Sequence, residues 1–88
     1  MASSPNSYRP VFSADAVALF TGLSRRRQRR LLDRAHELAA DPFLVPDFAS
    51  SDAEGRVIAH LLLDDFLFDY WVDHAARTVL IVGIDDAA

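Results

Sequence analysis

The 88-residue sequence contains no cysteine and no lysine, and none of its apolar runs is long enough to cross a membrane. The absence of cysteine excludes disulfide-stapled scaffolds and zinc sites built on thiolates. A membrane-spanning helix needs roughly 18 or more consecutive apolar residues. The opening MASSPNSYRP also lacks the hydrophobic region of a secretory signal peptide. We therefore expect a soluble, cytoplasmic protein with no membrane partner.

The composition is typical of one small globular domain. Hydrophobic residues make up 51% of the chain and charged residues 25%. This is enough apolar side chain for a core, but the chain is too short for two independent cores. Residues 1–7 are small and polar and include a proline, which predicts a disordered tail. A single domain is expected over residues 8–88.

Charge is distributed unevenly between the two halves. Residues 1–40 hold seven arginines and three acidic residues, a net charge of +4, whereas residues 41–88 hold two arginines and ten acidic residues, a net charge of −8. Because every cation is a planar guanidinium, the pattern suits forked contacts to phosphate or carboxylate groups. A GC-rich coding sequence, which favours arginine over lysine, accounts for the same bias equally well.

Capping residues and apolar spacing predict two helices. Ser13 is a suitable N-cap for a helix over 14–21, and Ser24 for a helix over 25–40 that ends before Pro42. The short link between them predicts a helical hairpin. The side chains expected to face a core are Val17, Phe20, Leu23, Leu31, Leu32, Ala35 and Leu38.

The remaining segments predict a small sheet. Residues 8–13 have β propensity, and Pro10 limits that strand to an edge or a solvent-facing position. Three β runs, at 56–64, 66–73 and 77–85, are joined by links so short that they predict an antiparallel meander. Residues 43–55 are predicted to be a loop, held against the core by Phe43, Leu44, Val45 and Phe48. The expected fold class is α+β, in the order β-α-α-β-β-β, with the helical hairpin packed on one face of a mainly antiparallel sheet.

Alternation in the 66–73 run separates its two faces. Phe66, Phe68, Tyr70 and Val72 are expected to face the helices, which leaves an open face with alternating apolar and acidic residues. An exposed apolar patch that contains a tryptophan is more often a binding surface than a surface without a function. An alternative is that the N-terminal tail covers it. The predicted partner-binding residues of the open face are Leu67, Trp71, Val79 and Ile81.

The sequence resembles the RelE/ParE superfamily of toxins from bacterial type II toxin–antitoxin systems. The resemblance rests on the opening YRPVFSADAVALF, an arginine-rich helix that ends in AADPF, and the closing YWVDHAARTVLIVGID. It covers roughly residues 8–86 and lies mostly in the order and spacing of elements. It implies a microbial-RNase-like fold, a bacterial cytoplasmic setting and an antitoxin protein as partner.

The family includes toxins that cleave messenger RNA on the ribosome and others that inhibit DNA gyrase. Cleavage needs a base for the attacking 2′-hydroxyl, cations for the phosphate and an acid for the leaving oxygen. Where RelE-type toxins carry basic residues, this sequence has Leu67 and Asp85. His60, with Arg56, remains as the candidate catalytic group. An acidic sheet repels RNA, so RelE-type cleavage is predicted to be absent or much reduced.

The arginine cluster between Arg25 and Arg30 has three interpretations. It could contact nucleic acid, form a solvated helix face, or pair with acidic residues of an antitoxin or of a second copy of the chain. We assign Arg26, Arg29 and Arg30 to partner binding. Neither the three histidines nor the Asp64–Asp65 and Asp85–Asp86 pairs match a common metal-ligand motif, so no metal or cofactor is expected.

The sequence therefore predicts a toxin-like component of a type II toxin–antitoxin system that acts mainly by binding an antitoxin or a second copy of itself. The alternative is an active toxin, either a ribosome-dependent mRNA interferase with a reduced site or a ParE-type inhibitor of gyrase.

Overall fold

The computed structural model describes residues 7–88, so the predicted tail lies almost entirely outside the described residues. Ser7 is exposed and belongs to no helix or strand. The elements, in chain order, are β1 (Arg9–Phe12), α1 (Ala14–Thr21), α2 (Arg25–Ala40), β2 (Phe48–Ser51), β3 (Val57–Leu63), β4 (Phe66–Asp73) and β5 (Thr78–Asp86).

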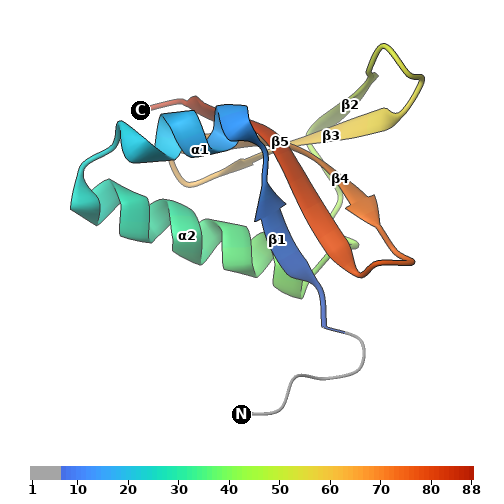
Figure 1. The fold of residues 1–88 in the computed structure, drawn as a ribbon, viewed down its shortest axis with the longest axis horizontal. Coiled ribbons are helices and arrows are strands. Elements are labelled where there is room, and N and C mark those ends of the chain that lie inside the picture. Colours follow the sequence, from blue (N-terminus) through green and yellow to red (C-terminus); the bar gives the residue numbers. More distant parts are fainter. Residues whose placement is uncertain (1–6) are drawn as a thin grey trace.

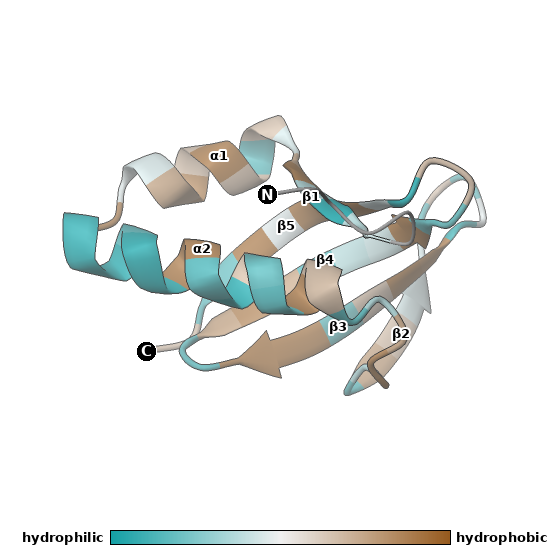
Figure 2. Ribbon diagram, turned by 90° about the horizontal axis from the view of Figure 1, so that it is seen from below, coloured by the Kyte–Doolittle hydropathy of each residue, from teal (hydrophilic) through white to brown (hydrophobic). Residues whose placement is uncertain are grey.

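The strands form one five-stranded sheet in the order β1-β5-β4-β3-β2 (Figure 1). β1 runs parallel to β5, and the other three pairings are antiparallel. The two helices lie together on one side of the sheet, with the polar side of α2 facing away from it (Figure 2). The predicted α+β class, the helical hairpin and the antiparallel meander are therefore confirmed.

Both helices begin at the serines that the sequence indicated. The Ser13 hydroxyl accepts a hydrogen bond from the backbone N–H of Ala16, and the Ser24 hydroxyl accepts one from Arg27. These bonds satisfy backbone donors that have no partner within the first turn of a helix. Because α2 ends at Ala40, with Asp41 as its C-cap, Pro42 lies just past its end as expected.

The core lies between the helices and one face of the sheet. Phe66, Phe68 and Tyr70 of β4 are buried, as their alternation predicted. Leu31, Ala35 and Leu38 of α2 are fully buried against the same cluster. Val17 and Leu32 were expected there, but both are exposed. These two side chains instead line a surface hollow of about 280 Å³, together with Phe12, Phe20 and Thr21.

The prediction of a loop over 43–55 is wrong in its second half. β2 pairs antiparallel with β3 through a turn at Gly55, which has a positive φ of 79°. The strand is short and exposed along its whole length, so no apolar alternation marked it in the sequence. Leu44 packs against the core, but Phe43, Val45 and Phe48 are 72%, 85% and 54% exposed. These three side chains therefore do not anchor the segment as predicted.

A β-bulge in β5 overturns two further predictions. Asp69 is opposite Gly83 and Tyr70 is opposite Ile81, so Val82 has no partner in β4. The extra residue reverses the alternation along β5. As a result Val79 and Ile81 point into the core and are fully buried, instead of lying on the open face.

Candidate functional site

The face of the sheet that the helices leave open carries most of the chemically distinctive side chains. On β4 it presents Leu67, Asp69 and Trp71, all of which are partly exposed. The pairing registers place His60 of β3 beside Asp69, and Leu80 of β5 beside Trp71. Leu67 and Trp71 thus lie where the sequence predicted them. Leu80, and not Val79 or Ile81, is the β5 residue that lies beside Trp71 on the open face.

Three side chains from three adjacent strands form a hydrogen-bonded chain across this face. The Asp69 Oδ1 atom lies 2.6 Å from His60 Nδ1, and His60 Nε2 lies 2.7 Å from the Ser50 hydroxyl. We call this chain the Ser50–His60–Asp69 relay. The His60 and Asp69 side chains are 14% and 24% exposed, whereas Ser50 lies on the exposed edge strand. The relay therefore runs from a partly buried carboxylate to a hydroxyl at the surface.

The chemistry of the three groups fixes the direction of the relay. A carboxylate only accepts hydrogen bonds, so the Asp69 contact places the imidazole proton on Nδ1. The Nε2 atom of a neutral ring then carries a lone pair and accepts the hydroxyl proton of Ser50. The arrangement matches that of a nucleophile, a general base and an orienting carboxylate.

Gly83 makes room for the carboxylate at the end of the relay. It is paired with Asp69 in the sheet, and a Cβ atom at this position would lie 3.1 Å from Asp69 Oδ2. A side chain at this position would therefore push the Asp69 carboxylate by a few tenths of an ångström. The lack of a side chain at Gly83 therefore leaves Asp69 free to lie against His60.

Two aromatic rings lie near the relay. The Phe48 ring is stacked on the His60 ring, with centroids 4.4 Å apart and an angle of 9° between the planes. At the next open-face position of β4, the Arg56 guanidinium lies 4.6 Å from the centre of the Trp71 ring. Arg56 also forms ion pairs with Asp52 and Glu54. The candidate catalytic residues His60 and Arg56 thus contact neighbouring open-face positions of β4, but two carboxylates offset the charge of Arg56.

The positions at which RelE-type basic residues were sought lie side by side. Leu67 of β4 is directly opposite Asp85 of β5, and on its other side it is paired with Leu62 of β3. This end of the open face is consequently apolar and acidic.

The arginines of α2 fall into two groups. Arg27 makes two hydrogen bonds of 2.7 Å to Asp86, and Arg30 makes two to Asp64, of 2.6 and 3.1 Å. The hydrogen bonds from Arg27 lower the pKa of Asp86 to about 2. These forked pairs connect the helix to the β3–β4 turn and to the end of β5. Arg30 is therefore already engaged within the chain, although we had assigned it to a partner.

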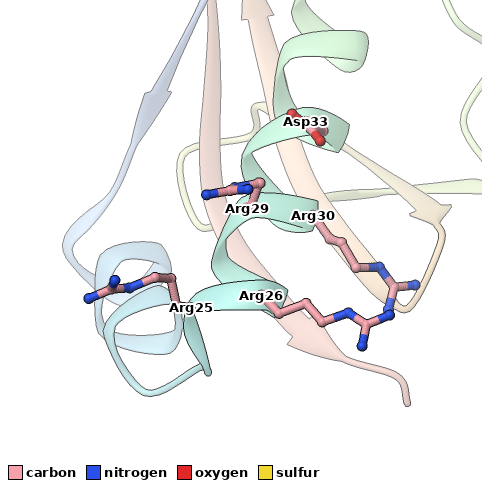
Figure 3. Close-up of a pocket in the computed structure, with 5 residues that line it drawn as sticks. All are labelled: Arg25, Arg26, Arg29, Arg30 and Asp33. Carbon is pink, nitrogen blue, oxygen red and sulfur yellow. The ribbon is translucent and has the colours of Figure 1, made fainter.

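Arg25, Arg26 and Arg29 form no ion pair with any of residues 7–88. Arg25 and Arg29 extend to one side of the helix, whereas Arg26 and Arg30 extend to the other (Figure 3). A shallow surface hollow of about 350 Å³ lies among these four arginines and Asp33. The helix places its free cations at its N-terminal end, where the helix dipole is also positive, so this surface favours an anionic partner.

The other histidines lie apart from the open-face relay. His36 is exposed on α2, and His74 is hydrogen-bonded to the Tyr8 hydroxyl in the β4–β5 turn. Within residues 7–88 no three His, Cys, Asp or Glu side chains are grouped closely enough to hold a metal ion. No helix among them has the length and apolar character needed to cross a membrane.

Sequence reasoning found His60 but missed Ser50 and Phe48, because both belong to the unrecognised strand β2. The alternation of the 66–73 run placed Asp69 among the acidic residues of the open face, but its contact with His60 depends on the β3–β4 register. The only usable signal was the spacing of Phe48 and Ser50, which puts both side chains on one face once the strand is known.

No protein-family model matches the sequence, and no curated protein is significantly similar to it. Solved structures do match. A chain of the RelBE2 toxin–antitoxin complex from Mycobacterium tuberculosis superposes with a TM-score of 0.72 at 20% identity, covering 91% of this chain and 98% of that one. A chain of the intact E. coli RelBE complex gives 0.69 at 15% identity, covering 93% and 99%.

The isolated E. coli RelE toxin gives a TM-score of 0.69 at 14% identity, covering 93% of this chain and 86% of the toxin. The matches extend over most of this chain and of each matched chain. This agrees with the element order and sheet topology described above. The chain therefore has the RelE toxin fold.

Proposed function

We propose that the protein is the toxin-like component of a type II toxin–antitoxin pair and acts mainly by binding its antitoxin. The observation that carries this proposal is the near-complete match to chains solved within RelBE toxin–antitoxin complexes. A fold by itself does not define an activity, so the proposal also relies on two surfaces suited to a protein partner.

The first surface is the apolar part of the open face. Trp71 is partly exposed beside Leu80, and Leu67 lies on the same side of β4. Large aromatic side chains at such positions commonly dominate the affinity of a complex. The second surface is the group of free arginines, Arg25, Arg26 and Arg29, which matches an acidic segment of an antitoxin in charge.

We further propose that RelE-type mRNA cleavage is lost. Leu67 and Asp85 occupy the expected basic positions, and Arg56 is paired with two carboxylates. An RNA backbone would therefore meet few free cations on the open face, and the nearby aspartates would repel it.

A binding measurement tests the main proposal. The chain is co-purified with the protein encoded by the adjacent gene, and the dissociation constants of the wild type, Trp71→Ala and Arg26→Glu/Arg29→Glu are compared. Loss of a hot-spot tryptophan is expected to weaken the complex by about 2 kcal/mol, roughly 30-fold in Kd. His36→Ala, at an exposed position of α2 about two turns beyond Arg29, is the control. An unchanged Kd for Trp71→Ala and for the arginine double variant would refute the assignment of both surfaces.

The relay favours a second candidate function, an mRNA interferase with a reduced site. His60 is oriented by Asp69 and has the geometry of a general base. The test is to induce wild-type and His60→Ala chains separately in a bacterial host and to follow growth and RNA integrity. Arrest with RNA cleavage by the wild type alone would establish this second function.

Arrest by both chains, with RNA intact, would indicate a non-catalytic target such as gyrase. No arrest by either soluble chain is the result expected for a protein that acts through binding.

A further inference from the structure

We propose that Ser50 is an activated nucleophile that accepts acyl groups from small carboxylic esters, with His60 as its general base and Asp69 as the residue that positions His60. The inference goes beyond the proposed function, because it requires neither an antitoxin nor RNA.

The geometry of the relay is more specific than a surface hydrogen bond needs to be. An exposed serine on an edge strand usually bonds water or nearby backbone. Here its hydroxyl lies 2.7 Å from the lone-pair nitrogen of an imidazole, and the other nitrogen of that ring lies 2.6 Å from a carboxylate. Three consecutive strands, β2, β3 and β4, contribute one residue each.

The surroundings hold the base in place and leave the nucleophile accessible. The Phe48 ring covers one side of the His60 ring, and Gly83 leaves the space that the Asp69 carboxylate occupies. Ser50 stays exposed on the outermost strand of the sheet. A rigid base next to an open hydroxyl is the requirement for attack on a substrate that arrives from solvent.

The side chains near Ser50 indicate the class of substrate. Ile58, its cross-strand partner, is buried, and the stacked Phe48 ring remains 54% exposed. The exposed part of the Phe48 ring offers apolar contact to an aryl or short acyl group. The surface is not built to hold a polyanion at this point, because Asp69 and the acidic turn at Asp52 and Glu54 lie nearby.

The reaction balances without any further reactant except water. His60 Nε2 takes the hydroxyl proton as Ser50 Oγ bonds to the ester carbonyl carbon. The carbon–oxygen bond to the alcohol then breaks, and the departing oxygen receives the proton from His60. A water molecule, deprotonated by His60, attacks the acyl-serine, which releases the carboxylic acid and restores the Ser50 hydroxyl.

The experiment uses the full chain with two probes, p-nitrophenyl acetate and an alkyl fluorophosphonate. With the second, Ser50 Oγ bonds to phosphorus, fluoride leaves, and intact-mass and peptide mass spectrometry locate the stable adduct. Ser51, the next residue of β2, is also exposed and, by the alternation of a strand, points to the opposite face, so it is a matched internal control.

The expected result is one adduct, on Ser50, that is absent from Ser50→Ala and unchanged in Ser51→Ala. His60→Gln is expected to lower the labelling rate at least 100-fold, because general-base assistance contributes about 10²–10⁴-fold. Asp69→Asn is expected to lower the labelling rate at least 10-fold and to move the ring proton of His60 from Nδ1 to Nε2 in ¹⁵N NMR spectra, which a purely structural role of Asp69 would not do.

Equal labelling of Ser50 and Ser51, or an unchanged rate in His60→Gln, would overturn the proposal. The hydrogen bonds would then serve only to join β2 to the rest of the sheet. Because the His60 and Asp69 variants could lose the β2–β3 pairing, ¹⁵N NMR of wild-type His60 provides a second test. A proton on Nδ1 of the neutral ring is expected, and a proton on Nε2 would overturn the assignment.

Discussion

The two faces of the sheet are formed by alternate residues of the same strands, but one face is buried under the helices and the other is partly exposed. On β4, Phe66, Phe68 and Tyr70 point under the helices and are almost completely buried, whereas Leu67, Asp69 and Trp71 point the other way and remain partly exposed. The first set fills the core and the second set lines the open face. Since alternate residues of one strand serve the two faces, the chemistry of the open face can change while the fold is kept. The matches to RelE structures at 14–20% identity are consistent with this division.

The largest expected effect is on the helix-covered face. Phe68 is fully buried between α2 and the sheet. Phe68→Ala leaves a cavity in addition to the lost transfer energy, so we expect the free energy of unfolding to fall by about 3–5 kcal/mol. Urea unfolding, followed by circular dichroism, measures this change in the free energy of unfolding.

The adjacent residue is the control for this comparison. Leu67 is partly exposed on the open face, so Leu67→Ala should cost less than about 1.5 kcal/mol because less buried surface is lost than at Phe68. Equal losses for the two variants would mean that another segment or a second copy covers the open face in solution.

The second prediction compares the two helix caps. The Ser13 hydroxyl accepts from Ala16 and also donates to the Val82 carbonyl, which belongs to the bulge of β5. The Ser24 hydroxyl accepts only from Arg27 and is exposed. Ser13→Ala should therefore cost about 1–2 kcal/mol, near the upper end for N-caps, and Ser24→Ala about 0.5–1 kcal/mol. Thermal unfolding of the two variants checks the order, and the reverse order would show that the bond to the bulge adds no stability.

The smallest effect concerns the rim between the two faces, where Arg27 holds Asp86. The pKa of Asp86 is lowered to about 2 from 3.8, mainly by the hydrogen bond from Arg27. A lowered pKa means that the ionised carboxylate stabilises the fold above pH 3.8, and that this contribution is lost as the pH falls towards 2. We expect Asp86→Asn to have a slightly lower Tm than the wild type at pH 6.

At pH 2 the difference between Asp86→Asn and the wild type should be much smaller. Thermal scans at several pH values measure it, with Asp85→Asn, which forms no ion pair with residues 7–88, as the control. A difference in Tm between Asp86→Asn and the wild type that stays constant down to pH 2 would contradict the pairing of Asp86 with Arg27.

Local signals were sufficient for the helices and for most of the sheet. Ser13, Ser24 and Pro42 act on backbone groups within one turn, so their effect could be predicted from neighbouring residues alone. The alternation in β4 likewise assigned its core face correctly. β2 was missed because an exposed edge strand has no apolar face to mark it, and its pairing with β3 supplies most of its order.

The sequence by itself determined the α+β class, the helical hairpin, the resemblance to RelE-type toxins, and the positions of Trp71 and Leu67 on the open face. Only the tertiary structure decided that Val79 and Ile81 are buried, because one unpaired residue at the bulge reverses the alternation of β5. It alone also brought Ser50, His60 and Asp69 together. Contacts across strands depend on register and pairing partners, and a chain of residues does not encode these at any fixed spacing.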